Sequence, residues 1–250
     1  MLTIERQKQI LDLLKIQTTI KIHELVKKTG ASESTIRRDL TELEQAKKLK
    51  RIHGGATLLK RILDEPTIAE KTVKNSQEKV RIAEKAASII EEGDCIFLDA
   101  GTTTVEMIPF LMDKDITVVT NGITNISLLA DLNIETHVIG GYVKTGTRAS
   151  VGRNAIRLIE TFRFDKAFLG VNGISEFDGC TTPDPEEAFI KEYAKKCSRQ
   201  SYVLVDHSKF GEVSFSKFAD IKEITIITSD INEELVNNYR KLTNIEVASL

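Results

Sequence analysis

Short apolar segments alternate with amphipathic segments from Ser76 to the end of the chain, and this alternation restricts the fold more than any other feature. The apolar segments are rich in β-branched residues, as buried strands of a mainly parallel sheet are. They span 95–100, 116–121, 135–141, 166–171, 201–206 and 223–230, and the helical segments span 79–90, 105–112, 125–132, 154–162, 186–197 and 232–242. The pattern predicts an α/β domain over residues 76–250, an open sheet with helices on both faces.

The first 56 residues have a different pattern, that of short helices. Segments 5–15 and 21–30 carry apolar residues at helical spacing, and Gly30 is a natural helix end. After a two-residue step, Ser32 is suited to cap a third helix through its side-chain oxygen. A short helix, a tight turn and a second helix form a helix-turn-helix. The inward face of the third helix is predicted to consist of Ile36, Leu40 and Leu43.

The opposite face of the third helix carries arginines and hydroxyl groups. Arginine bonds guanine O6 and N7, and serine and threonine reach phosphates or base edges, so this face predicts insertion into the major groove of DNA. The alternative is that the two arginines pair with Glu33 or Glu42 on a solvated helix. The candidate DNA contacts on this helix are Ser34, Thr35, Arg37, Arg38 and Thr41.

A basic hairpin follows the third helix. Its signal is the pair Gly54 and Gly55 between two short apolar runs, which predicts a wing whose Lys50, Arg51 and His53 contact backbone phosphates or the minor groove. The formal net charge of −2 hides an asymmetry, because residues 1–60 hold 13 Lys and Arg against 7 Asp and Glu. Unevenly charged solvated surface is the alternative, yet the charge and the helix pattern together predict that this head binds double-stranded DNA.

Residues 57–75 contain Pro66, carry mixed charge and show no strand pattern. They are predicted to form a linker that partly docks on the α/β domain. The expected organisation is therefore a winged helix-turn-helix over 1–56, a linker over 57–75 and an α/β sensor domain over 76–250.

Ligands of open α/β sheets bind beyond the carboxyl ends of the strands, so the residues after each predicted strand are the candidate binding residues. The strand 95–100 runs into a glycine and three threonines, with a helix expected to begin at once, and such a loop attracts phosphate. It lacks the GK[ST] ending of a Walker A loop, which argues against a nucleoside triphosphate. A threonine-capped turn without a ligand is the alternative. The candidate residues here are Asp99, Gly101, Thr102, Thr103 and Thr104.

Other predicted strand ends at the same edge supply small and amide residues, and Arg148, Lys191 and Lys209 are expected to add positive charge. Taken singly, each basic residue is an ordinary surface charge; together they predict a pocket for a small phosphorylated polyol, with Asp99 or Glu187 accepting from sugar hydroxyls. The remaining candidate residues are Asn121, Gly122, Gly140, Gly141, Arg148, Asn172, Lys191 and Lys209.

A sugar-phosphate isomerase with a DNA-binding head is the alternative from a different class. Proton transfer at a sugar carbon needs a carboxylate base, but the strand 166–171 runs into Asn172 and Gly173, which take no proton. Glu186 and Glu187 more simply favour the N-terminus of the helix that follows them. The sequence therefore predicts a sensor without catalytic residues.

Composition narrows the remaining classes. The three cysteines are far apart and the four histidines lack metal-ligand spacing, so we expect reduced thiols, a cytoplasmic protein, and neither a metal site nor a cofactor. No run of about 18 uncharged apolar residues is present, which argues against a membrane span.

The segments ESTIRRDLTELE and LKRIHGGA resemble the winged helix of the DeoR family of bacterial transcription regulators, and DAGTTT, VVTNGI, IGG and DHSKF resemble its sensor domain. The resemblance implies a fold like that of ribose-5-phosphate isomerase, a sugar-phosphate effector, and a repressor that acts on operator half-sites as a dimer or tetramer. DGCTTPDPEEAFIKE and LDEPTIAEK more narrowly resemble the fructose-operon repressors of Gram-positive bacteria, which implies fructose 1-phosphate. Related repressors of lactose and deoxyribonucleoside operons share the framework and remain alternatives.

Overall fold

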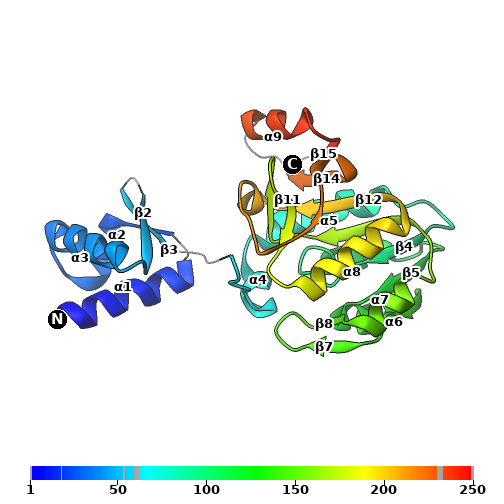
Figure 1. Ribbon diagram of the computed structural model, residues 1–250, viewed down its shortest axis with the longest axis horizontal. Helices are drawn as coiled ribbons and strands as arrows, with labels where there is room; N and C mark the ends of the chain where they lie inside the picture. The colour runs from blue at the N-terminus through cyan, green and yellow to red at the C-terminus, as the bar shows by residue number, and fades with distance from the viewer. Residues whose placement is uncertain (1, 18, 53, 59–61, 230–232, 249–250) are drawn as a thin grey trace. The chain divides into compact units, whose positions relative to one another are not determined.

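The computed structural model describes residues 2–17, 19–52, 54–58, 62–229 and 233–248 (Figure 1). The chain divides into two compact units, Met1–Arg61 and Ile62–Leu250. Each unit has a hydrophobic core of its own.

The first unit is a small three-helix, three-strand domain. Its core is built by residues at helical spacing, with Leu14, Leu25, Ile36 and Leu40 fully buried. The strands pair antiparallel in the order β1-β3-β2, so β2 and β3 form the wing. The elements are α1 (Thr3–Gln17), β1 (Thr19–Lys21), α2 (Ile22–Thr29), α3 (Glu33–Gln45), β2 (Leu49–Ile52) and β3 (Gly55–Leu58).

Two local signals define the turn between α2 and α3. Gly30 adopts a left-handed conformation with φ of 69° after the last residue of α2, and its N–H donates to Val26 O. The Ser32 side chain accepts from the N–H of Thr35 and caps α3. The predicted helix-turn-helix and wing are confirmed.

The second unit is built on a seven-stranded sheet in which every neighbouring pair is parallel. The strand order is β15-β14-β12-β9-β4-β5-β6. From β4 the chain adds β5 and β6 on one side, and it then returns to add β9, β12, β14 and β15 on the other side, so the order reverses between β4 and β9. In sheets of this kind the crevice outside that reversal is where ligands bind. The strands are β4 (Cys95–Leu98), β5 (Thr117–Thr120), β6 (Glu135–Val138), β9 (Phe164–Gly170), β12 (Ser198–Val205), β14 (Thr225–Ser229) and β15 (Ile245–Ala248).

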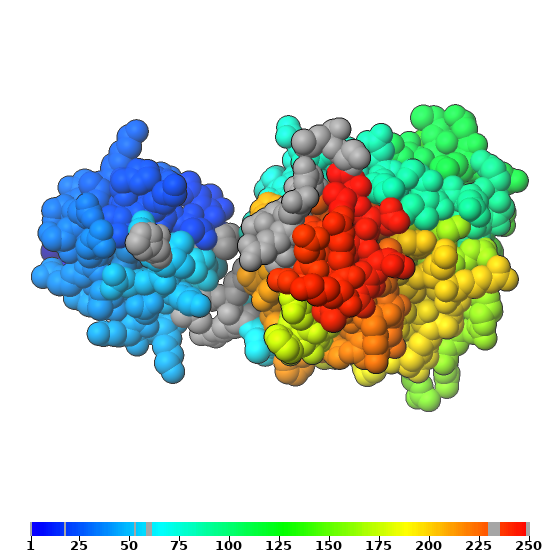
Figure 2. Space-filling view, turned by 90° about the horizontal axis from the view of Figure 1, so that it is seen from above, coloured from blue at the N-terminus to red at the C-terminus, as the bar shows by residue number. Residues whose placement is uncertain are grey.

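Side chains alternate across this sheet and fill two separate cores. Ile96 and Leu98 of β4 belong to one core, whereas Phe97 between them belongs to the other. The first core is covered by α5 (Ser76–Ser88), η1 (Val105–Leu111) and α6 (Ile123–Asp131), and the second by α7 (Arg153–Ile159), α8 (Pro185–Lys196) and α9 (Glu233–Arg240). Helices on both faces of an open parallel sheet are confirmed. In Figure 2 the residues of α9 and β15 form part of the visible surface of this unit.

Several short elements were not predicted. A three-stranded antiparallel sheet and a hairpin lie outside the main sheet. They consist of β10 (Gly173–Ser175), β11 (Gly179–Thr182) and β13 (Ser216–Ala219), and of β7 (Tyr142–Lys144) and β8 (Ala149–Val151), beside the 3₁₀ turns η2 (His207–Lys209) and η3 (Ile221–Glu223).

Two segments contain structure that the sequence pattern did not specify. Within residues 57–75, β3 continues to Leu58 and a helix with a capping box, α4 (Ile68–Val73), follows Pro66. The helical segment predicted at 105–112 is a 3₁₀ helix, η1 (Val105–Leu111), with Pro109 inside it, where an α-helical N–H donor is missing. In the part of the chain that the structure describes, no helix has the length and apolarity to cross a membrane.

Candidate functional site

The outward face of α3 exposes Ser34, Arg37 and Arg38, with Thr35 and Thr41 half-buried beside them. Both arginines have the carboxylate neighbours that the alternative interpretation names: Arg37 Nη2 lies 2.6 Å from Glu33 Oε1, and Arg38 Nε lies 3.9 Å from Glu42 Oε1. Exposed pairs one helical turn apart contribute only about 0.2–0.5 kcal/mol. Such pairs are weak enough to exchange for DNA phosphates or bases.

The wing is attached to this face through Arg51. Its Nη1 donates to Thr41 Oγ1 at 2.8 Å, and its backbone N–H donates to Glu44 Oε1 at 2.7 Å. Lys50 is exposed on the same strand, and His53 lies outside the described residues. Arg51 thus joins the wing to the face of α3 that carries the other predicted DNA contacts.

Arg6 and Asp39 form a buried ion pair that the sequence analysis missed. Arg6 Nη2 donates to Asp39 Oδ1 at 3.1 Å, and the Asp39 side chain is fully buried. The pair joins α1 to the inner side of α3, and it fixes the helix that carries Arg37 and Arg38. Helical spacing could have predicted that Asp39 is buried, because it places Asp39 on the inward side of α3 together with Leu40.

In the sensor domain, Asp99 and Lys191 meet at the reversal between β4 and β9. The Lys191 ammonium donates to Asp99 Oδ2, and the N–H of Gly170, the last residue of β9, donates to the same oxygen at 2.9 Å. Both side chains are buried. Burial raises the pKa of Asp99, while Lys191 and Gly170 oppose that rise. This pair ties α8 to the carboxyl end of β4 at the place where the topology favours a ligand.

The loop Gly101 to Thr104 lies next to this pair. Thr104 Oγ1 donates to the carbonyl oxygens of Asp99 and Gly101, so the Thr104 hydroxyl shapes the turn itself, as the capped-turn alternative expects. The Thr102 hydroxyl instead accepts from Lys79 Nζ at 3.0 Å. Among the described residues, no group accepts from the backbone N–H of Gly101, Thr102 or Thr103, although both threonines are buried. Since η1 is short and 3₁₀, these N–H groups, rather than a long helix dipole, are what the loop offers an anion.

Four lysines surround this loop, and only two of them were predicted. Lys79 of α5 is buried, and burial lowers its pKa to about 8, with Asp206 opposing and Lys209 and Lys71 adding to the decrease. Burial also lowers the pKa of Lys71 of α4, to which Lys209 and Lys191 contribute. Like charges that depress one another's pKa values form a site suited to a multivalent anion. In the sequence, Lys71 lies in the predicted linker and Lys79 at the start of a predicted helix, and neither differs from a solvated surface charge. Only the folded structure joins them, because Lys79 Nζ donates to both Thr102 Oγ1 and the carbonyl oxygen of Lys71.

Glu187 belongs to a neighbouring network of hydrogen bonds and ion pairs. It accepts from Thr147 Oγ1 at 2.6 Å and from Lys144 Nζ at 3.0 Å, and Lys144 also pairs with Glu65 and Asp184. Burial opposes ionisation, yet Lys191, Thr147 and Lys144 keep the pKa of Glu187 below its usual range. The carboxylate is therefore a fixed hydrogen-bond acceptor.

Four other predicted effector residues have structural contacts or lie on the surface. Asn121 Oδ1 accepts from the N–H of Ala100, and Asn172 Oδ1 accepts from Thr182 Oγ1, so both amides stabilise loops. Gly141 packs against β8, where a Cβ atom would lie 2.4 Å from Val151 O, and Gly140 is exposed. None of these four residues lines the cavity described next.

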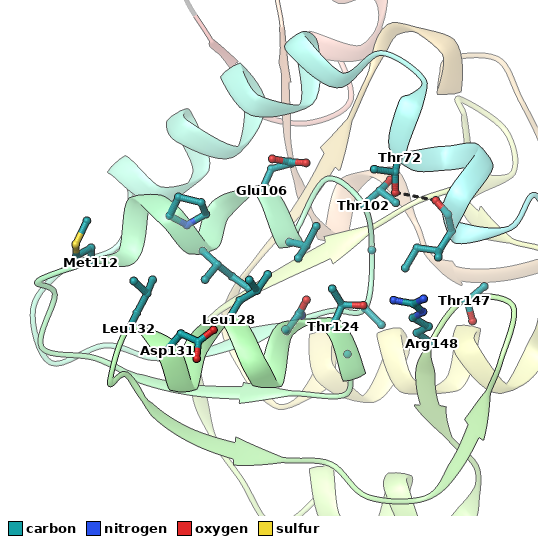
Figure 3. Close-up of a pocket in the computed structure, with 18 residues that line it drawn as sticks. Thr72, Thr102, Glu106, Met112, Thr124, Leu128, Asp131, Leu132, Thr147 and Arg148 are labelled. Carbon is teal, nitrogen blue, oxygen red and sulfur yellow. Dashed lines mark hydrogen bonds between the residues drawn. The ribbon is translucent and has the colours of Figure 1, made fainter.

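A cavity of about 480 Å³ opens beside the loop (Figure 3). Thr72, Thr102, Thr147 and Arg148 lie at one end, and Met112 and Leu132 lie at the other. Of the predicted residues it includes Gly101, Thr102, Gly122 and Arg148. The rest of its wall combines apolar side chains, among them Val105, Ile108 and Leu128, with polar ones that include the carboxylates of Glu106 and Asp131. The end with Thr102, Thr147 and Arg148 suits an anionic group, whereas Glu106 and Asp131 add carboxylates to the rest of the wall.

Glu78, Asp206 and His207 are close enough together to suggest a cation site, with ligand atoms within 4.8 Å of one another. Their acceptor groups are already used. Glu78 accepts from Ser229 Oγ and from the backbone N–H of His207, with its second oxygen 2.6 Å from His207 Nδ1. The Asp206 carboxylate accepts from Asn75 and Ser208. The arrangement is a hydrogen-bond network that positions Lys209 three residues on.

Comparisons with known proteins agree with this two-part architecture. Residues 6–61 match the family description "DeoR-like helix-turn-helix domain" and residues 74–231 match "DeoR C terminal sensor domain". An uncharacterized HTH-type transcriptional regulator, FruR, of Bacillus subtilis is 51% identical over 99% of each chain. A lactose phosphotransferase system repressor of Staphylococcus epidermidis is 32% identical over 98% of each chain. Among solved structures, ribose 5-phosphate isomerase A of Methanocaldococcus jannaschii is 17% identical over 55% of each chain, with a TM-score of 0.42.

Proposed function

The chain belongs to the DeoR family of DNA-binding transcription regulators, and we propose that it represses a sugar-utilisation operon and leaves its operator when a sugar phosphate binds the sensor domain. In this proposal, α3 and the wing contact double-stranded operator DNA. The loop Gly101 to Thr104 and the surrounding lysines bind the phosphate of the effector.

One observation supports the effector site above the others. Lys79 is a buried lysine without an ion-pair partner among the described residues, and it donates to Thr102 in a loop whose N–H groups lack acceptors. A buried ammonium beside free N–H donors is costly unless an anion joins them. A phosphate provides several acceptor oxygens and the compensating charge.

Fructose 1-phosphate is the effector that we propose first. The name of the Bacillus subtilis relative and the sequence motifs support a fructose operon, since this relative is much more similar than the lactose repressor. Asp99, Glu187 and Arg148 supply acceptors and a donor for the hydroxyl groups of the sugar. A repressor of a lactose or deoxyribonucleoside operon is the second candidate, favoured by the lactose repressors among the relatives.

The protein is a regulator rather than an enzyme, and its full-length relatives are named as transcriptional regulators and repressors. The local chemistry agrees. Asn172, after β9, bonds Thr182 and takes no proton, and Glu187 is held ionised by its neighbours.

We further propose that two or more copies grip operator half-sites, as a dimer or a tetramer. Half-site spacing must match the arrangement of the heads, so a change in that arrangement lowers affinity. The effector can lower operator affinity by no more than the factor by which it binds one arrangement of the heads more tightly than the other.

Binding of the purified protein to operator fragments, titrated with fructose 1-phosphate and other phosphorylated hexoses, tests this function. We expect release by fructose 1-phosphate at lower concentration than by fructose 1,6-bisphosphate, glucose 6-phosphate or unphosphorylated fructose. Operator binding that no phosphorylated sugar changes contradicts the effector proposal. Release by a tagatose or deoxyribose phosphate alone favours the second candidate.

A further inference from the structure

We propose that the segment Ile62–Asn75, which follows the head in the chain, forms part of the effector site, with Lys71 binding the effector phosphate and the docking of α4 carrying the signal toward the head. This inference rests on the proposed sugar-phosphate effector. It adds a specific ligand and a specific coupling element to that function.

The segment contacts the sensor domain at the same place as the effector residues. Ile68 and Thr72, one turn apart on α4, line the cavity together with Gly101 and Thr102 (Figure 3). The Lys79 ammonium, which bonds Thr102, also donates to the carbonyl oxygen of Lys71. One buried lysine thus bridges the phosphate loop and the segment.

The docking of the segment is weak. Helix α4 has six residues, of which Ile68 and Lys71 are half-buried and none is fully buried. The segment Ile62–Asn75 is also attached to the sensor domain through polar contacts. The Ile68 N–H donates to Gly146 O at 3.0 Å, and Ile62 O accepts from the Phe215 N–H at 3.1 Å. Glu65 forms an ion pair with Lys144 at 2.9 Å. A short helix with little buried apolar surface has low local stability, so a ligand is able to shift its docking.

The charge distribution makes docking sensitive to an anion. The structure gives Lys71 no ion-pair partner among its described residues, and Lys191 and Lys209 lie near enough to oppose its charge. Glu187 and Glu65 compensate only in part, since both already bind Lys144. A phosphate between Lys71, Lys79 and Lys209 changes the repulsion into attraction, so the occupied site holds α4 docked and the empty site favours its release.

The position in the chain connects this docking to DNA binding. The wing strand β3 ends at Leu58, and the second unit begins at Ile62. Fixing the segment shortens the free connection between the head and the sensor domain, which restricts how the heads of an oligomer are spaced. The element is therefore a two-state connection whose equilibrium the effector biases.

Hydrogen exchange of the full-length protein, with and without fructose 1-phosphate, tests the inference together with calorimetric binding and operator release. The variant is Lys71→Gln; it lies on a helix without buried residues, so the fold is not at risk. Lys222→Gln, an exposed lysine on η3, removes the same charge elsewhere as the matched control.

In the wild type and the control we expect fructose 1-phosphate to slow exchange across 62–75. In Lys71→Gln we expect about 10-fold weaker binding, the loss of one charge-assisted bond, and little protection of the segment. Saturating effector lowers operator affinity by a certain factor in the wild type, and in this variant that factor is expected to be at least about 5-fold smaller.

Two results separate the inference from the function on which it rests. If fructose 1-phosphate binds and releases operator while exchange of 62–75 is unchanged and Lys71→Gln behaves as the wild type, the inference is wrong and the effector function stands. If no phosphorylated sugar in the panel binds the wild type, both are wrong.

Discussion

Replacing Lys79 with methionine is expected to weaken effector binding and, at the same time, to stabilise the protein without effector. The substitution removes the ammonium group beside Thr102 and keeps a flexible side chain of similar length. The two effects have opposite signs because the buried charge is costly in the empty site and useful in the occupied one.

The size of the stability effect follows from the pKa. Burial, opposed by Asp206 and reinforced by Lys209, lowers the pKa of Lys79 from 10.5 to about 8. Keeping the group charged at pH 7 therefore costs at most about 3 kcal/mol. The variant leaves Thr102 Oγ1 and Lys71 O without their donor, which costs about 1 kcal/mol each. The net gain at pH 7 is about 1 kcal/mol.

The dependence on pH has a definite sign. Between about pH 8 and 10.5 the unfolded chain holds a proton on Lys79 that the folded protein has lost, so this group adds stability to the wild type as the pH rises. The variant lacks that increase, and its advantage disappears across the same interval. Effector affinity of the wild type is expected to fall above pH 8, as Lys79 loses its charge.

Calorimetry with fructose 1-phosphate and urea unfolding at pH 7 and pH 9.5 measure both effects, with Lys222→Met as the control. Loss of a charge-assisted hydrogen bond worth about 1.5–3 kcal/mol predicts about 10- to 150-fold weaker effector binding. A folded Lys79→Met protein with wild-type effector affinity refutes the reasoning. In that case Lys79 only attaches α4 and the loop to each other.

Five further substitutions test the other parts of the structure. Arg37→Ala or Arg38→Ala is expected to weaken operator binding by about 1–3 kcal/mol if the arginine contacts a base. Lys50→Ala is expected to weaken binding to all DNA sequences equally and to lower by about one the slope of log affinity against log salt concentration. Wild-type operator affinity in both arginine variants contradicts this assignment. Asp39→Asn leaves Arg6 buried without its counter-charge and is expected to destabilise the head by about 3–5 kcal/mol in urea unfolding, and an unchanged transition means that solvent compensates. Gly101→Val brings a side chain toward Thr104 Oγ1 and into the proposed phosphate space; it should keep operator binding and lose release, and release at the wild-type effector concentration places the pocket elsewhere.

Most of the main sheet was predictable because its strands are continuous apolar runs. All six predicted strands occur, while β15 was missed since Ile245–Ala248 is short and only partly apolar. The strands β10 and β11 were missed because each is three or four residues long and contains glycine, so neither alternation nor length identifies them. The pairing of β11 with β13 also depends on contacts between distant parts of the chain.

The candidate site was predictable in part, mainly where a residue directly follows a strand. The loop Gly101 to Thr104 was found in this way, because strand ends in a parallel sheet share one edge. Lys71 and Lys79 lie on helices well before that loop in the chain, and nothing in their local sequence distinguishes them from solvated lysines. The sequence also gave no sign that Asp99 and Lys191 pair with each other.

A crystal structure of the protein with fructose 1-phosphate tests the central claim most directly. The account predicts phosphate oxygens at hydrogen-bond distance, about 2.7–3.2 Å, from the backbone N–H groups of Gly101 to Thr103 and from Lys79 Nζ, with α4 docked beside them. A phosphate bound away from this loop, with the N–H groups of Gly101 to Thr103 still lacking acceptors, would contradict it.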